Sequence, residues 1–389
     1  MIINRIKLGN WRNFRTVDVA LGRRVFVIGP NASGKSNFLD VFRFLRDVAK
    51  PGGGLQTAIS DRGGLSKIRC LAARKYPDVE IAVELSSEDG KKCVWKYEIG
   101  VKQQKAGLRR AFLSHERVWK DGKQILDRPD DDDKKDEARL TQTHLEQVNA
   151  NQEFREIAEL FESISYLHVV PQILRNPKAF TGPGLPGDPF GRQLLERVAK
   201  TPEKTRKSRL KRIEAALRYA VPQLKELSYE VDTPEGGIPH LEAVYEHWRP
   251  HGAKQREVDF SDGTLRLIGL LWSLQEGQAP LLLEEPELSL NGAIVRKLPS
   301  LIHQATRKNK RQVLISTHSA DLLSDKGIGS EETLLLFPDK EGTRVEPASD
   351  EEDIRQLLQE GLSIAEAALP RIEPKNVHQL FFDYNRGIG

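Results

Sequence analysis

Gly29–Ser36 is the segment of this sequence whose residue types and spacing most clearly indicate a chemistry. It reads Gly-Pro-Asn-Ala-Ser-Gly-Lys-Ser, which matches the phosphate-loop pattern G-x-x-x-x-G-K-[ST]. In this pattern the backbone folds around phosphate oxygens, the lysine reaches the β- and γ-phosphates, and the hydroxyl binds Mg²⁺. Lys35 and Ser36 are the candidates for the last two roles. The other residues expected to contact a nucleotide here are Asn31, Ala32, Ser33, Gly34 and Asn37.

Two adjacent carboxylates form the second candidate group. The apolar run Leu281–Leu283 ends in Glu284 and Glu285. A phosphate loop needs an acidic group that supports Mg²⁺ and a group that orients water. Because neighbouring side chains of a strand point to opposite faces, one glutamate can approach the metal while the other approaches the attacking water. Taken alone, the pair would also fit a strand end with surface glutamates.

A histidine and a helix start complete the candidate site. His318 follows the apolar run Val313–Ser316, and Ser261 resembles the N-cap of a helix that contains Gly263. A helix start with a small hydroxyl residue and a glycine can bind an anion. Each feature by itself is also typical of an ordinary structural residue. Since the carboxyl ends of parallel strands share one edge of a sheet, we expect His318 and both glutamates to meet the phosphate loop there.

The elements that must position these residues can be predicted from hydrophobic periodicity. Before residue 50 we expect alternating strands at 2–8 and 17–21, a buried strand at 25–28 and a helix at 36–48. Residues 79–118 alternate again and predict a small antiparallel meander, with turns at 88–91 and 105–107.

The second half of the chain alternates helices with apolar strands. The expected elements are a helix from 263, strands at 281–283, 313–316 and 334–337, and a helix at 293–306. This alternation predicts a parallel sheet. Residues 351–389 predict two short helices with a proline-rich break at Pro370 and Pro374.

The middle of the chain is less regular. The charged run Asp130–Lys135 predicts a solvated loop, and residues 142–163 predict a helix. Residues 176–189 are rich in proline and glycine and predict a loop, whereas residues 191–221 predict a helical stretch with a basic run. Thirteen prolines lie between residues 36 and 260, so we do not expect a long coiled-coil arm.

The composition is that of a globular protein. The 389 residues carry 60 Lys and Arg against 56 Asp and Glu, so any nucleic-acid-binding charge must be local. Two cysteines exclude a disulfide framework and a cysteine-rich zinc site. No apolar run approaches the ~18 residues of a membrane span. We therefore expect a cytoplasmic protein with no membrane partner.

As a set, these motifs resemble those of the ABC-type ATPases of the SMC, RecF and OLD group, which includes RecF-like AAA ATPases. The matching segments are Gly29–Ser36 for the Walker A motif, Leu281–Glu285 for Walker B, Ser261–Gly263 for the signature motif, His318 for the switch histidine and Asn10–Phe14 for the N-terminal N-F-R-x-F segment. The resemblance covers mainly residues 1–50 and 255–340 and implies ATP and Mg²⁺ as cofactors.

The resemblance also implies a role for each residue. Glu284 would support the metal, Glu285 would be the catalytic base, His318 would sense the γ-phosphate, Arg12 would lie near the nucleotide, and Ser261 with Gly263 would contact the γ-phosphate held by the opposite protomer. Glu284 departs from the aspartate of many ABC ATPases, and Asn291 stands where many have the aspartate of the next loop. Gln56 and Gln172 are both candidates for the Q-loop glutamine.

The predicted fold is α/β: an ABC-type ATPase head, with a P-loop sheet, helices and an antiparallel β subdomain, and an inserted, partly helical lid domain. The expected units are an N-terminal lobe at 1–110, the lid at 111–251, a C-terminal lobe at 252–340 and a helical tail at 341–389. By resemblance, ATP would close the heads into a homodimer or a higher oligomer, and hydrolysis would open it.

The resemblance implies a DNA-associated ATPase in repair, recombination or anti-phage defence. Residues 200–218 hold eight basic and two acidic residues, which fit either a phosphate-backbone contact or a solvated helix face. The candidate DNA contacts are Lys204, Arg206, Lys207, Arg209, Lys211 and Arg212. Only 71 residues follow His318, too few for the TOPRIM nuclease of OLD-type relatives, so a nuclease or other effector would be a separate partner.

Two other functions remain open from the sequence. One is the energising subunit of a membrane transporter, although the roughly 225 residues between Ser36 and Ser261 exceed the compact helical insert of such subunits. The other is a binding module that uses ATP only to change shape, with negligible turnover. ATPase activity measured with and without duplex DNA would separate these readings.

Overall fold

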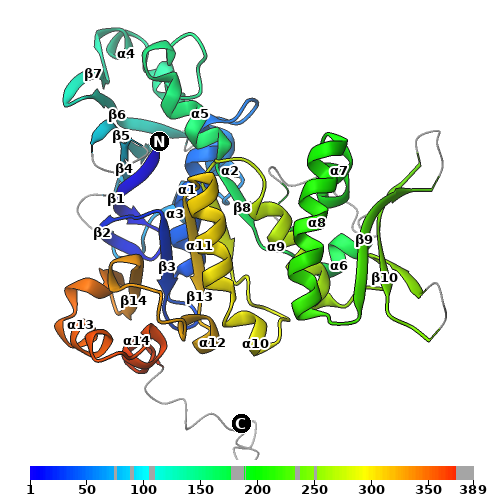
Figure 1. Ribbon diagram of the computed structural model, residues 1–389. Coiled ribbons are helices and arrows are strands. Elements are labelled where there is room, and N and C mark those ends of the chain that lie inside the picture. Colours follow the sequence, from blue (N-terminus) through cyan, green and yellow to red (C-terminus); the bar gives the residue numbers. More distant parts are fainter. Residues whose placement is uncertain are drawn as a thin grey trace, which may run out of the picture.

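The computed structural model describes residues 1–73, 77–87, 92–104, 110–176, 188, 190–232, 237–248 and 252–373 (Figure 1). Its strands form two six-stranded sheets and one three-stranded sheet. The turns predicted at 88–91 and 105–107, most of the loop predicted at 176–189 and the tail beyond residue 373 lie outside the described residues.

The first sheet is antiparallel, in the order β2-β1-β4-β5-β6-β7. Its strands are β1 (Ile2–Trp11), β2 (Phe14–Ala20), β4 (Val79–Ser86), β5 (Cys93–Gln103), β6 (Ala111–Lys120) and β7 (Lys123–Arg128). Alternate residues of β4 are buried, as one-sided packing requires. The predicted N-terminal strands and antiparallel meander are thus confirmed.

The second sheet has the order β15-β14-β3-β13-β12-β8, and all its pairs are parallel except the hairpin of β14 with β15. Its strands are β3 (Arg24–Ile28), β8 (Ser165–Leu167), β12 (Leu281–Glu284), β13 (Val313–Thr317), β14 (Thr333–Asp339) and β15 (Gly342–Pro347). β3 and β13 are buried along their whole length, because helices or another sheet cover both faces.

The two faces of the parallel sheet belong to two hydrophobic cores. Val25 and Val27 of β3 join the core shared with the first sheet and helix α1 (Lys35–Ala49), whereas Phe26 and Ile28 face the other core. That second core contains α9 (Asp262–Leu274), α11 (Leu298–Asn309) and α12 (Ala320–Leu323). Helix α1 therefore lies between the sheets and carries the phosphate loop at its start (Figure 1).

The segment predicted as a lid shares its strands with other parts of the molecule. β6 and β7 extend the first sheet across residue 111, and β8 is the edge strand of the parallel sheet. The rest of the segment includes α5 (Arg155–Ser163), α6 (Pro171–Arg175), α7 (Leu194–Lys200), α8 (Glu203–Ala220) and the sheet β11-β10-β9, with β9 (Leu224–Val231), β10 (Pro239–Tyr245) and β11 (Ala253–Arg256). The boundary expected at residue 110 thus falls inside a sheet.

Three local predictions are wrong. The run Asp130–Lys135 is not a solvated loop, because Asp130 caps helix α4 (Asp131–Lys135) and Asp133 is buried against Arg128. Residues 142–151 are not helical, residues 152–154 form a 3₁₀ turn, and the α-helix begins only at Arg155. Pro370 does not break the tail, because it lies within α14 (Ile364–Ile372), which follows α13 (Glu352–Gln359).

The remaining helices are short. They are α2 (Leu55–Ser60), α3 (Leu65–Ile68), α10 (Gly292–Val295) and the 3₁₀ turns Glu137–Thr141, Gln152–Phe154, Ser330–Glu332 and Ala348–Asp350. Across the described ranges the longest helix is α8, with 18 residues, so the expectation of no long coiled-coil arm holds for that part of the chain. In the same part of the chain, no helix is both long and apolar enough to cross a membrane.

Candidate nucleotide site

The phosphate loop lies between β3 and α1, as its pattern predicts. Gly34 precedes the helix with φ +99°, a conformation that favours glycine, and a Cβ there would lie 2.2 Å from Asn13 Nδ2. Asn13 donates to the Ser33 carbonyl at 2.8 Å and accepts from Asn37 Nδ2 at 2.8 Å. Asn13 thus braces the loop against the N-terminal strands.

Lys35 is buried under the loop. Its Nζ donates to the carbonyls of Gly29 at 2.9 Å and Pro30 at 3.1 Å. Burial lowers the pKa of Lys35, and the nearby charges of Glu285 and Glu284 oppose that shift. The lysine therefore lies within electrostatic reach of both glutamates that the sequence selects.

Glu284 lies at the centre of a cluster of oxygen atoms. Ser36 Oγ donates to its Oε1, and the hydroxyl of Tyr166 donates to its Oε2. Tyr166 is on β8, the strand next to β12, and the guanidinium of Arg43 from α1 stacks 4.3 Å from its ring centre. Serine and glutamate thus meet although 248 residues separate them in the chain.

Glu285 and His318 meet at the ends of two adjacent strands. Glu285 Oε1 lies 3.0 Å from His318 Nδ1, and the backbone N–H of Glu285 donates to the Ser316 carbonyl at 3.0 Å. Glu285 has φ +44°, which is uncommon for a residue other than glycine and is typical of functional sites. This turn directs Glu285 towards His318 rather than along the strand.

A third glutamate supports this turn. Glu287 is buried and accepts a hydrogen bond from Thr317 Oγ1 at 2.5 Å, and burial raises the pKa of Glu287.

Asn291, in the loop after Glu287, caps α10 by accepting a hydrogen bond from the Ala293 N–H at 2.9 Å. The residue that departs from the aspartate of many ABC ATPases therefore has a local structural contact.

The predicted signature segment begins α9. Ser261 is its N-cap and accepts from the Thr264 N–H at 3.1 Å, as the sequence predicts. A Cβ at Gly263 would lie 2.7 Å from the Ser289 carbonyl, so this glycine permits the helix to approach the loop after β12. Beside it, Gln172 donates to Asp262 Oδ2 at 2.8 Å.

The two candidate Q-loop glutamines have different surroundings. Gln56 Nε2 donates to the backbone carbonyls of Ala111 at 2.9 Å and Thr141 at 2.8 Å, which is a structural contact between segments. Gln172 follows β8, at the same edge of the parallel sheet as Glu284, and is exposed. Gln172 is therefore the one of the two glutamines that contacts the predicted signature segment, at Asp262.

Arg12 lies beside the phosphate loop in a salt bridge. Its Nη2 is 2.7 Å from Asp40 on α1, and Arg62 also binds Asp40, at 2.9 Å. Arg12, Asn13 and Asn37 line a hollow of about 670 Å³, a size that suits a small-molecule ligand. Asn31 and Ala32 are exposed at the tip of the loop.

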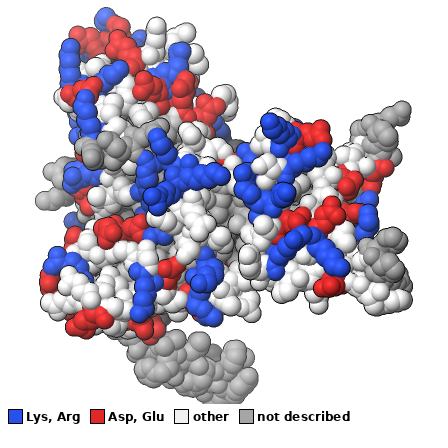
Figure 2. Space-filling view, in the orientation of Figure 1, with Lys and Arg blue, Asp and Glu red and all other residues white. Residues whose placement is uncertain are grey.

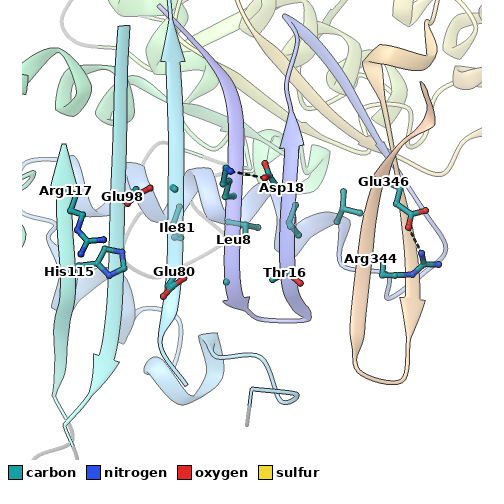
Figure 3. A pocket seen from close by; sticks show the side chains of 15 residues that line it. Leu8, Thr16, Asp18, Glu80, Ile81, Glu98, His115, Arg117, Arg344 and Glu346 are labelled. Carbon is teal, nitrogen blue, oxygen red and sulfur yellow. Dashed lines mark hydrogen bonds and ion pairs between the residues drawn. The ribbon is translucent and has the colours of Figure 1, made fainter. Parts of the chain in front are cut away.

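A different hollow, of about 640 Å³, lies on the outer face of the first sheet (Figure 3). Its side chains carry both signs of charge, with Asp18, Glu80 and Glu98 interspersed with Lys7 and Arg117. None of the residues selected from the sequence lines it. The surface in Figure 3 is therefore separate from the nucleotide site.

Sequence reasoning missed two residues of the site. Tyr166 belongs to no recognisable motif, and the three-residue strand Ser165–Leu167 that holds it was not predicted from the sequence. Asn13 belongs to the N-terminal segment, but only its contacts with Ser33 and Asn37 reveal its role.

The comparisons with known proteins agree with this fold. A family model described as "AAA domain, putative AbiEii toxin, Type IV TA system" (AAA_21) matches residues 24–325. No curated protein sequence matches the chain.

Two solved structures share the architecture. An Smc head bound to the C-terminal winged-helix domain of ScpA has 14% identity and a TM-score of 0.52, with 89% of this chain and 98% of that chain covered. The Smc head of Pyrococcus furiosus, with an extended coiled coil and the C-terminal domain of ScpA, has 12% identity, a TM-score of 0.50 and coverage of 92% and 99%. At these identities the likeness shows the fold, which is the predicted ABC-type head. Since the family match spans well over half of the chain, this protein belongs to the AAA_21 family of ATPases.

Proposed function

We propose that this protein binds and hydrolyses ATP with Mg²⁺ and uses the nucleotide as a switch. The observation that carries the proposal is the meeting of Ser36 with Glu284 and of Glu285 with His318 beside Lys35. These residues come from three separate parts of the chain. A phosphate loop, a metal-side acid and a water-orienting acid at one edge are the groups that phosphoryl transfer requires.

The oxygen donors suit Mg²⁺. Magnesium prefers hydroxyl, carboxylate and water oxygens, and Ser36 Oγ and a Glu284 oxygen already lie together. When bound, Mg²⁺ would neutralise the charge of the phosphates. Ser36 and Glu284 are the residues that would hold it.

Each of the remaining site residues would have a separate role in the reaction. Lys35 would place its ammonium beside the terminal phosphates, and the hollow lined by Arg12 and Asn37 would hold the nucleoside. Glu285 would accept the proton of the attacking water, and His318 would hold that carboxylate in position through its 3.0 Å contact. His318 would then respond to the loss of the γ-phosphate.

The switch would act through a second copy of the chain. Ser261 and Gly263 begin α9 with backbone N–H groups that can bind an anion, and they would close the nucleotide site of the opposite protomer. ATP would thus lie within a homodimer interface. Hydrolysis would remove the γ-phosphate contact and favour opening.

The proposed role is in nucleic-acid-linked defence or repair, with a separate nuclease or other effector as the output. The family's description as a "putative AbiEii toxin, Type IV TA system" favours defence. α8 supplies the basic residues expected to meet DNA.

Lys35→Ala tests the proposed nucleotide site. We expect it to weaken ATP binding about 10- to 100-fold, because it removes a charge-assisted contact with phosphate. Binding of a fluorescent ATP analogue measures this, with the exposed Lys123→Ala as the matched control. Equal affinity in the two variants would show that nucleotide binds elsewhere.

Tyr166→Phe tests the support of Glu284. Loss of the hydroxyl removes one of the two side-chain donors to this carboxylate, and such outer contacts typically change metal affinity 10- to 100-fold. We expect the Mg²⁺ concentration for half-maximal ATP-analogue binding to rise about 10-fold. Tyr219→Phe, at a residue 92% exposed, is the control. An unchanged Mg²⁺ midpoint would make Tyr166 a packing residue only.

A further inference from the structure

A third hollow, of about 650 Å³, is lined mostly by basic residues. It is lined by Arg23, Arg24, His303, Arg307, Lys310 and Glu332. Among the described residues that line it, Glu332 has the one carboxylate, and this charge is neutralised because Arg24, only 6% exposed, places its Nη2 2.6 Å from Glu332 Oε2. The described lining is therefore positive, in contrast to the mixed charges of the surface in Figure 3.

The hollow lies at the opposite edge of the parallel sheet from the nucleotide site. Arg24 is the first residue of β3, and the phosphate loop follows the last residue of the same strand. Five strand residues span roughly 17 Å. A ligand in this hollow would therefore leave the phosphate loop accessible.

One loop joins the hollow to the basic face of α8. After α9, Gln275 Oε1 accepts from Arg212 of α8 at 2.7 Å, and the Leu274 carbonyl accepts from Asn309 of α11 at 3.2 Å. Figure 2 shows the result as two adjoining areas of Lys and Arg, one over the end of α11 and one over α7 and α8. The two helices are thus held in a fixed relation.

The structure also shows which cations of α8 are available. Arg206 stacks on Tyr229 at 4.1 Å, and Arg209 lies 5.3 Å from the ring of Trp272, so both take part in packing. Lys207 pairs with Glu203 at 2.5 Å. The helix alone therefore offers fewer phosphate contacts than its sequence indicates.

Helices α8 and α11 carry exposed cations for which the structure gives no acidic partner among the described residues. They are Lys204 and Lys211 of α8 and Arg307 and Lys308 of α11, and all four are exposed. With Arg23 of the hollow and Arg212, they define what we call the basic surface. Its charge comes from two helices and the start of a strand, not from one run of sequence.

We propose that this basic surface binds the phosphate backbone of duplex nucleic acid. This inference rests on the proposed function, which names nucleic acid as the partner. The new element is the surface of the protein to which the nucleic acid binds. Unpaired cations along a surface release counterions from a phosphate backbone, which gives affinity without base contacts. Single strands are instead held by stacking on aromatic side chains, and no Phe, Tyr or Trp lines the described part of the hollow.

The test is the variant Lys211→Gln/Arg307→Gln/Lys308→Gln. Fluorescence anisotropy of a labelled DNA duplex should show a Kd at least about 10-fold higher than that of the unmodified protein. The slope of log K against the logarithm of the salt concentration should be smaller in magnitude by about 2 to 3. A control variant, Lys123→Gln/Lys134→Gln/Arg355→Gln, removes three exposed charges elsewhere and should bind DNA like the unmodified protein.

Further measurements separate this inference from the proposed function. Both variants should bind the ATP analogue normally, because the changed residues lie away from the phosphate loop. If the unmodified protein does not bind ATP, the proposed function is wrong. If the two variants bind DNA with equal affinity, only the assignment of the basic surface as the DNA-binding site is wrong. The affinity for duplex RNA, single-stranded DNA and inorganic phosphate is measured in the same way. Tighter binding to single-stranded DNA than to duplex would also overturn the inference.

Discussion

Glu285→Gln is expected to bind ATP normally and to hydrolyse it at least about 100-fold more slowly than the unmodified protein. The amide has the same shape as the carboxylate, so it can keep the φ of +44° and the contact with His318. It cannot accept the proton of the attacking water. Because hydrolysis would open the dimer, the variant should accumulate as an ATP-bound dimer. Phosphate release and light scattering with ATP and Mg²⁺ measure the two effects.

The matched control for this variant is Glu360→Gln, which changes an exposed glutamate at the end of α13. It should hydrolyse ATP at the unmodified rate and should not accumulate as a dimer. Turnover by Glu285→Gln equal to that of the control would show that another group activates the water. Slow turnover with a monomeric ATP-bound state would retain the base and reject the switch through dimerisation.

Arg128→Ala is expected to cause a large loss of stability, about 3–5 kcal/mol. Arg128 is 1% exposed and bridges two fully buried carboxylates, at 3.0 Å from Glu116 and 2.8 Å from Asp133. Removing the guanidinium leaves both carboxylates without their main partner. Chemical denaturation measures the difference in unfolding free energy. Arg117→Ala, which breaks an exposed pair with Asp127, should cost less than about 1 kcal/mol.

The same cluster predicts a dependence on pH. The hydrogen bond from Arg128 holds the pKa of Asp133 well below its usual range, so the folded state binds a proton less readily than the unfolded state. The stabilisation is therefore complete above the unfolded pKa of about 4 and is lost as the pH falls further. Arg128→Ala should lose less stability than the unmodified protein over that acidic range. A loss equal to that of the unmodified protein would show that Arg128 does not control Asp133.

Local pattern was sufficient for much of the fold and for the ends of the strands that carry chemistry. The phosphate loop, the strand before Glu284 and the strand before His318 are each defined by a few consecutive residues, because periodicity and loop composition act over short distances. The N-cap at Ser261 was predictable for the same reason. Parallel pairing of the strands in the second half of the chain could also be predicted from the sequence, because these strands alternate with helices.

The errors arose where side-chain pairing overrides local composition. Asp130–Lys135 is charged enough to predict a solvated loop, but Asp133 is buried because it pairs with Arg128, which also pairs with Glu116 of β6. Tyr166 has no local signature at all, because its meaning depends on the placement of β8 beside β12. The division at residue 110 could not show that β6 extends the first sheet.

The amino-acid sequence alone determined which chemical groups this protein possesses: a phosphate-binding loop, two glutamates after one strand and a histidine after another. Only the tertiary structure decided that Tyr166 and Ser36 share Glu284, and that cations of α8 and α11 form one surface. The physical reason is that side-chain pairing and surface charge depend on which distant segments pack together. That packing is a property of the whole folded chain and not of any short stretch of it.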